Sequence, residues 1–180
     1  MVDSTTVVLR LGLAFVLGFA LGLERELRGQ MAGLRTHILV SLGACLFTLA
    51  SVLIAAPVGT QSLEGVEVDV SRIASQVVVG IGFLGAGSIL RHGTAVKGLT
   101  TAANLWLTAS VGLSVGLGFP LAAAITVGLA LLALVGLRPL ERAIARWRQG
   151  RGKKTVEERL ASDVSSDEEE HTHEAPRETP

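Results

Sequence analysis

Residues 99–137 read LTTAANLWLTASVGLSVGLGFPLAAAITVGLALLALVGL, a run of 39 residues without a charged side chain. A helix that crosses a hydrocarbon core of about 30 Å needs about 20 residues, so this run is long enough for two crossings. Gly116, Gly118 and Pro120 lie at its middle, where such residues are typical of a tight turn. The run therefore predicts two membrane-spanning helices, residues 99–117 and 119–137.

Three further apolar segments precede this run, at residues 7–23, 38–56 and 73–90. Only the first contains a charge, Arg10, which lies close enough to the segment's end to reach the membrane interface. A soluble fold of this size would place charges in every helix to keep one face in water. The sequence therefore predicts an all-α protein, a polytopic bundle of five transmembrane helices.

The connections between these segments alternate in charge. Five basic residues lie in residues 24–37 and 91–97: Arg25, Arg28, Arg35, Arg91 and Lys97. Residues 57–70 contain Glu64, Glu67 and Asp69 but no lysine or arginine. Because lysine and arginine accumulate in cytoplasmic loops, we expect the N-terminus outside and the C-terminus in the cytoplasm.

The residues after the fifth segment change composition twice. Leu140, Ile144 and Trp147 fall on one helical face of the basic residues 138–152, which predicts an amphipathic juxtamembrane helix. Residues 153–180 are polar and acidic, a composition typical of a disordered tail. Residues 1–137 form the expected transmembrane domain. Because the basic block adjoins a membrane span, we expect it to bind lipid and not nucleic acid.

Residues 80–85 read GIGFLG and match the dinucleotide-binding pattern G-x-G-x-x-G. That pattern requires a preceding strand and an acidic residue about twenty positions later. Here it lies inside an apolar span, and residues 97–104 contain no carboxylate. No catalytic Ser/His/Asp or Cys/His set, P-loop or zinc-binding spacing is recognisable. We therefore expect a protein without enzymatic activity, cofactor or bound metal, and the single cysteine, Cys45, excludes an internal disulfide.

Small and polar residues share faces of the third and fourth spans, and we treat them as a candidate functional seam. Its members are Gln76, Gly80, Gly82, Gly85, Gly87, Thr100, Asn104 and Thr108. Glycines in a span allow neighbouring helices to approach closely, but they also weaken a helix and can mark a broken helix that lines a cavity. Both interpretations remain open. Two G-x-x-x-G pairs, Gly18/Gly22 and Gly112/Gly116, indicate no particular dimer in a chain with 21 glycines.

Three motifs in order, GFALGLERELRGQMAGLRTH (18–37), RIASQVVVGIGFLGAGSI (72–89) and GLTTAANLW (98–106), resemble the MgtC/SapB family. The resemblance covers roughly residues 10–137. It implies a bacterial cytoplasmic-membrane protein that supports growth at low Mg²⁺, and it places a candidate cytoplasmic-face motif at Glu24, Arg25, Arg35, Thr36 and His37. Better-known members carry a folded cytoplasmic domain after the spans. We do not expect residues 138–180 to replace it.

Three hypotheses for function follow. The first, which the resemblance supports, is a non-enzymatic protein that regulates other membrane proteins, such as the F-type ATP synthase, during adaptation to low Mg²⁺ or acid. The second is a small oligomeric channel or carrier for Mg²⁺ or another cation. The third is a stability module without a ligand. The expected partners are the lipid bilayer, other membrane proteins and further copies of the chain.

The charge alternation gives a direct test of topology. Single cysteines placed at Ser62 and at Ser166 should react with a membrane-impermeant thiol reagent from opposite sides of the membrane. The measurement is labelling of intact cells against labelling of permeabilised cells, after Cys45 has been replaced by alanine. Reaction of both positions from the same side would contradict five spans.

Overall fold

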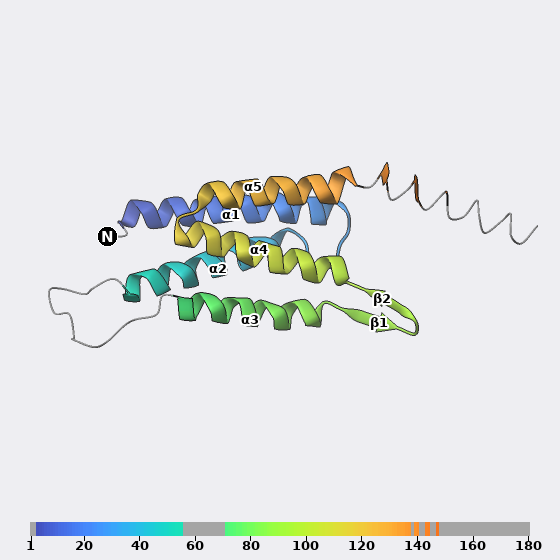
Figure 1. Ribbon diagram of the computed structural model, residues 1–180, viewed down its shortest axis with the longest axis horizontal. Coiled ribbons are helices and arrows are strands. Elements are labelled where there is room, and N and C mark those ends of the chain that lie inside the picture. The colour runs from blue at the N-terminus through green and yellow to red at the C-terminus, as the bar shows by residue number, and fades with distance from the viewer. Residues whose placement is uncertain (1–2, 56–70, 138, 141–142, 145–146, 148–180) are drawn as a thin grey trace, which may run out of the picture. The chain divides into compact units, whose positions relative to one another are not determined.

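The structure, a computed structural model, describes residues 3–55, 71–137, 139–140, 143–144 and 147. These residues form five α-helices, one π-helical turn and two short strands (Figure 1). The elements are α1 (Ser4–Leu27), α2 (Leu34–Ala55), α3 (Ser71–Gly87), β1 (Leu90–His92), β2 (Ala95–Lys97), α4 (Leu99–Leu117), α5 (Pro120–Leu131) and the π-helical turn Leu132–Gly136. The predicted helical bundle is confirmed. Each predicted span overlaps one α-helix, but the third extends beyond α3 and the fifth continues from α5 into the π-helical turn. The two strands were not predicted.

Helix α2 lies between α1 and α4, and its interfaces with them are the most extensive in the bundle. Both G-x-x-x-G pairs lie at these interfaces. A β-carbon on Gly18 would lie 2.8 Å from Cβ of Ser41, and one on Gly116 would lie 2.7 Å from Cβ of Thr48. A β-carbon on Gly112 would collide with the Ser41 carbonyl oxygen. The glycine pairs therefore bring the α1 and α4 backbones against α2 within one chain.

The apolar core fills the space that these three helices enclose. Leu21 of α1, Leu49 of α2 and Val115 of α4 are each at most 1% exposed. Ala123 of α5 is buried in the same cluster. Two of the helices, Ser4–Leu27 and Leu34–Ile54, are long and apolar enough to cross a membrane.

The turn between α4 and α5 follows the predicted glycine and proline. Gly118 ends α4 with φ +95°, and Pro120 is the first residue of α5, a position that tolerates its missing N–H. The Arg10 guanidinium donates a hydrogen bond of 2.6 Å to the Gly116 carbonyl oxygen. A cation at this end of α4 compensates the negative pole of the helix. Arg10 is thus held by the bundle's own backbone.

The strands form a hairpin that extends beyond the helices at the end of the bundle where α1 connects to α2 (Figure 1). β1 and β2 are antiparallel, with Arg91 opposite Val96. The predicted third span continued to residue 90, but α3 ends at Gly87. Gly98 explains the tight return into α4, because its φ of +91° favours glycine and a β-carbon there would collide with the Ser88 carbonyl oxygen.

The chain separates into two compact units, Met1–Leu132 and Ala133–Pro180. In the second unit, Leu140, Ile144 and Trp147 are exposed. The remaining predictions for the basic segment 138–152 and for the acidic tail 153–180 lie outside the described residues. The same is true of the acidic connection 57–70.

The packing of α1 on α2 predicts opposite effects of one substitution at two positions of α1. Gly18→Ala should lower stability by about 1–3 kcal/mol, because an added methyl group meets backbone and Cβ atoms of α2. Gly12→Ala is the matched control, since a β-carbon there would have nothing within 4 Å and alanine favours helix by about 0.5–1 kcal/mol. Thermal unfolding of the purified protein in detergent measures both. Equal effects would contradict the close contact.

Candidate functional site

Buried polar side chains gather where α1 ends, α2 begins and α4 begins. We call this group the polar layer: Glu24 and Arg25 of α1, His37 of α2, and Thr101 and Asn104 of α4. Each is at most 8% exposed. Buried polar groups are normally hydrogen-bonded, and burial of a charge without compensation is costly. The partners of these side chains therefore indicate what the layer can do.

The three helices hold the polar layer in register. Ser41 lies against Gly18 on one side and against Gly112 on the other. One turn nearer the α1–α2 connection, Cβ of His37 lies 3.0 Å from the position that a β-carbon on Gly22 would take. One further turn along, the Arg25 Nη2 atom donates a hydrogen bond of 2.6 Å to Thr101 Oγ1 and thereby joins α1 to α4. Successive turns of the three helices therefore place these side chains around one axis.

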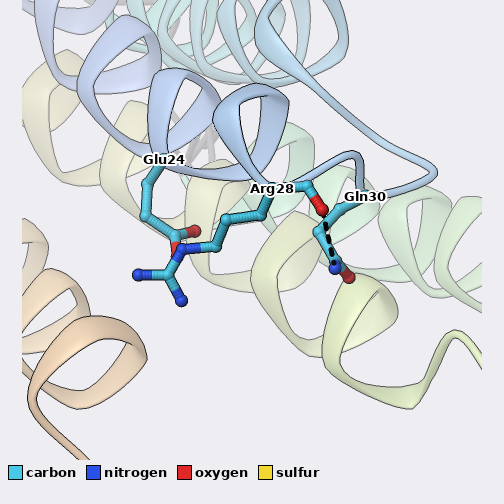
Figure 2. A network of polar contacts seen from close by, with 3 residues as sticks. All are labelled: Glu24, Arg28 and Gln30. Atoms are coloured by element: carbon cyan, nitrogen blue, oxygen red, sulfur yellow. Dashed lines mark hydrogen bonds and ion pairs between the residues drawn. The ribbon is translucent and has the colours of Figure 1, made fainter. Parts of the chain in front are cut away.

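Glu24 forms an ion pair with Arg28, one turn later on α1. Figure 2 shows the Arg28 side chain reaching back along the helix, and Nε lies 2.5 Å from Glu24 Oε1. The arrangement lacks hydrogen-bond geometry, so both Glu24 oxygens are buried without a hydrogen bond from the described residues. Gln30 Nε2 in turn approaches the Arg28 carbonyl oxygen at 3.5 Å. Glu24 also lies in electrostatic range of Arg25, so one carboxylate faces two guanidinium groups.

The imidazole of His37 is completely buried and its orientation is fixed. Nδ1 lies 2.8 Å from the Gly33 carbonyl oxygen, which can only accept, so Nδ1 carries the hydrogen. Nε2 is therefore an acceptor in the neutral ring. It has no hydrogen-bond partner within the described part of the chain. Glu24 and Arg25 lie in electrostatic range of the ring.

The α1–α2 connection is ordered by a second acidic residue, Glu26. Its carboxylate accepts a hydrogen bond of 3.0 Å from the Leu34 backbone N–H, one of the unpaired donors at the start of α2. A side chain at Gly33 would collide with this carboxylate. Of the other residues in the predicted cytoplasmic-face motif, Arg35 and Thr36 are exposed, whereas Glu24, Arg25 and His37 belong to the polar layer.

The predicted seam is divided between two places in the structure. Gln76 and Gly80 line an apolar cavity of about 560 Å³ between α2 and α3, and Ala109 of α4 also lines it. Asn104 lies in the polar layer. Thr108 is buried one turn along α4 and donates a hydrogen bond of 2.8 Å to the Asn104 carbonyl oxygen.

The other four seam residues differ in their surroundings. Gly85 is buried, and a β-carbon there would lie 3.6 Å from Cβ of Ala102. A β-carbon on Gly82 or Gly87 would have nothing within 4 Å, which is also true of Gly80, and Thr100 is exposed. In the described residues, the close approach of α3 to α4 is therefore at Gly85.

The sequence-based selection missed the polar face of α2. Ser41 and Thr48 are completely buried, and Ser41 donates a hydrogen bond of 2.8 Å to the Ala14 carbonyl oxygen of α1. The spacing of His37, Ser41 and Thr48 at four and seven residues, on an otherwise apolar helix, was a signal that could have identified this face. Within the described residues, no group of three His, Cys, Asp or Glu side chains is placed to hold a metal ion.

A bundle of apolar helices, two of which are long enough to cross a membrane, fits the class of α-helical membrane proteins. The MgtC family model matches residues 11–143, and the chain belongs to the MgtC family. A protein of Haemophilus influenzae without a functional name is 37% identical over 167 residues, which cover 91% of this chain and 68% of that protein. No solved structure matches the chain.

Other relatives carry names. YhiD of Escherichia coli K12, named as a candidate magnesium transporter, is 49% identical over 111 residues, or 62% of this chain and 51% of YhiD. Protein MgtC of Brucella abortus is 40% identical over 139 residues, or 77% of this chain and 54% of that protein. The chain thus spans about half the length of these two relatives.

The ion pair of the polar layer predicts non-additive substitutions. Arg28→Gln should lower the free energy of unfolding by about 1–3 kcal/mol, because it leaves the buried Glu24 carboxylate with less compensation. The double variant Glu24→Gln/Arg28→Gln should be less destabilised than the sum of the two single variants. Denaturant unfolding of the four proteins in detergent measures the coupling. Strict additivity would show that the ion pair contributes nothing.

Proposed function

We propose that this chain is a multi-pass protein of the bacterial cytoplasmic membrane that supports adaptation to low Mg²⁺ by binding another membrane protein through α3. The glycine-rich face of α3 carries this proposal. Atoms of α2 occupy the space beside the G-x-x-x-G glycines of α1 and α4. By contrast, Gly80, Gly82 and Gly87 have open space beside them in the described structure. Small residues favour helix association in membranes, and those of α3 are still available.

The shape of the same surface supports lateral binding. The cavity beside Gly80 is lined by apolar side chains of α2 and α3, with Gln76 as its amide. Phe83 is 81% exposed and Val79 is 68% exposed, so α3 presents bulky side chains beside its glycines. Projections beside hollows of this size are what a second helix requires in order to pack. The surface therefore suits a transmembrane helix of a partner protein.

The orientation that we propose follows from the two connections at one end of the bundle. Arg35 lies at the start of α2, and Arg91 and Lys97 lie on the hairpin at the same end (Figure 1). All three are exposed. Basic residues of this kind favour the cytoplasmic side, which would place the polar layer near the cytoplasm and Arg10 near the outer face. With this orientation, α1 to α5 cross the membrane five times.

The link to Mg²⁺ rests on the family and on the name of YhiD, which also makes transport the second candidate function. Mg²⁺ requires an octahedral set of oxygen ligands and retains much of its water. The lining of the α2–α3 cavity offers one amide, Gln76, and otherwise apolar side chains. That lining suits a helix better than a hydrated cation, so we favour regulation by contact over transport and over any enzymatic role.

A substitution at α3 tests the proposal. Gly80→Leu should accumulate normally, because the position is open, but it should fail to restore growth of a deletion strain at limiting Mg²⁺. Gly128→Leu on α5 is the matched control, since a β-carbon there would also meet nothing within 4 Å, and it should restore growth fully. Full activity of Gly80→Leu at a normal protein level would contradict binding through this face.

The transport alternative has its own measurement. Purified protein in liposomes loaded with a Mg²⁺-sensitive dye should give the same dye signal as empty liposomes after external Mg²⁺ is added. A protein-dependent influx that Gly80→Leu abolishes would support transport and would replace regulation by contact as the function.

A further inference from the structure

We propose that the cavity between α1 and the α4–α5 turn binds one anionic glycerophospholipid of the phosphatidylglycerol type, and that Arg10 holds the lipid's phosphate group. The inference rests on the multi-pass placement that we propose for the chain and not on the role of α3. Arg10 belongs to α1, and the open glycines belong to α3. The two proposals can therefore fail separately.

Arg10 carries a charge that has no carboxylate partner in the described part of the chain. The carboxylates there belong to Asp3, Glu24 and Glu26. Asp3 and Glu26 accept hydrogen bonds from backbone N–H groups at the starts of α1 and α2, and Glu24 pairs with Arg28. A guanidinium group does not lose its charge in proteins, and a charge within an apolar span is unfavourable without compensation. Arg10 therefore requires an anion or water from outside this part of the chain.

The bundle fixes the guanidinium group but neutralises only part of its charge. Nη1 donates a hydrogen bond of 2.6 Å to the Gly116 carbonyl oxygen. The negative pole of a helix amounts to about half an elementary charge, so about half of the positive charge remains. A β-carbon on Gly118 would lie 2.8 Å from Nη2, so the group lies against the turn. A guanidinium has five N–H donors, and the described residues accept from one of them. The others can bind a phosphate, which arginine recognises through parallel hydrogen bonds.

A cavity of about 250 Å³ adjoins this guanidinium group. At roughly 30 Å³ for each molecule of water, it is several times larger than one water molecule requires. The residues that line it are Leu9, Arg10, Leu13, Val115, Gly118 and Pro120. Leu9 is 67% exposed and Pro120 is exposed, so the cavity opens at the surface of the bundle. One cation beside apolar side chains suits an amphiphile, because its phosphate can meet Arg10 while an acyl chain covers Leu9 and Leu13.

The position of Arg10 along α1 fits the depth of a lipid phosphate. Helix α1 has 24 residues and is about 36 Å long, which exceeds a hydrocarbon core of about 30 Å. Arg10 lies six residues, or about 9 Å, from the start of α1 at Ser4. The α4–α5 turn lies at the same end of the bundle (Figure 1), and the guanidinium group contacts it at Gly118. A long basic side chain near a helix end reaches the membrane interface, where the phosphates of lipids lie.

The charge of the site favours an anionic lipid over a zwitterionic one. Phosphatidylglycerol carries one negative charge on its phosphodiester, which balances the charge of Arg10. Phosphatidylethanolamine adds an ammonium group, and the described lining offers no carboxylate to receive it. Inorganic phosphate would exchange its water for apolar side chains and a single cation, which is unfavourable. The lipid phosphodiester is therefore the anion that matches both the charge and the lining.

The test is native mass spectrometry of the full-length protein in detergent, titrated with phosphatidylglycerol or with phosphatidylethanolamine of identical acyl chains. We expect the first phosphatidylglycerol to bind more tightly than phosphatidylethanolamine by about 10- to 150-fold, the effect of one hydrogen bond to a charged group. Equal affinity would leave Arg10 to interfacial water and overturn the proposal. Displacement of the lipid by an excess of soluble glycerol phosphate would also overturn it, because the acyl chain would then contribute nothing.

Variants place the lipid at Arg10. Arg10→Gln keeps a donor for the Gly116 carbonyl oxygen but removes the charge, so it should weaken phosphatidylglycerol binding by about 10- to 150-fold. Arg35→Gln is the matched control, because it makes the same change at an exposed arginine at the start of α2, and it should leave the affinity unchanged. Unchanged affinity in Arg10→Gln, or a loss in Arg35→Gln, would overturn the assignment. If Arg10→Gln does not accumulate, Arg35→Gln and the headgroup preference of the unmodified chain decide it.

Discussion

The contact of two backbones with one helix determines this structure. Ser41 of α2 lies between Gly18 of α1 and Gly112 of α4, at distances that leave no space for a side chain on either glycine. Dispersion and short hydrogen bonds, such as that from Ser41 Oγ to the Ala14 carbonyl oxygen, are the forces available between helices in a lipid environment. They act only at short range. The small residues of α1, α2 and α4 are therefore what makes a stable bundle possible.

The same contact explains how charged side chains are held inside the bundle. Helices in contact at Gly22 and His37 exclude lipid and bulk water from the level at which Arg25 reaches Thr101. Arg10 and Arg25, at opposite ends of the bundle, each donate a hydrogen bond to α4. Arg10 donates to the Gly116 carbonyl oxygen, and Arg25 donates to the Thr101 hydroxyl group. In both cases a guanidinium group joins α1 to α4. The glycines allow the helices to approach closely, and these two hydrogen bonds fix the position of α1 along α4.

The helices and the turn between α4 and α5 could be predicted from sequence because each depends on local composition. The charge-free run from Leu99 and the turn at Gly118 and Pro120 are examples. The hairpin was missed because it depends on the left-handed conformation of Gly98 against the Ser88 carbonyl oxygen, a contact across two segments. Pairings between helices were equally invisible. Asn104 was grouped with Gly80 because both lie on neighbouring spans, whereas the structure buries Asn104 near the start of α4 and places Gly80 beside an open cavity.

Some glycines of the bundle are packed against a neighbouring helix, and others have open space beside them. The packed glycines determine the stability of the bundle, whereas the open ones leave a surface available for binding. The α1–α2–α4 unit uses its G-x-x-x-G pairs internally, so substitutions there act on folding before they act on any partner. Helix α3 packs on α4 at Gly85 and leaves Gly80, Gly82 and Gly87 open. A helix with so many glycines loses helical stability at each one, by about 1 kcal/mol relative to alanine. Packing within the described chain does not offset that cost at Gly80, Gly82 and Gly87, and this is the physical basis for our proposal that α3 gains contacts when a second helix binds.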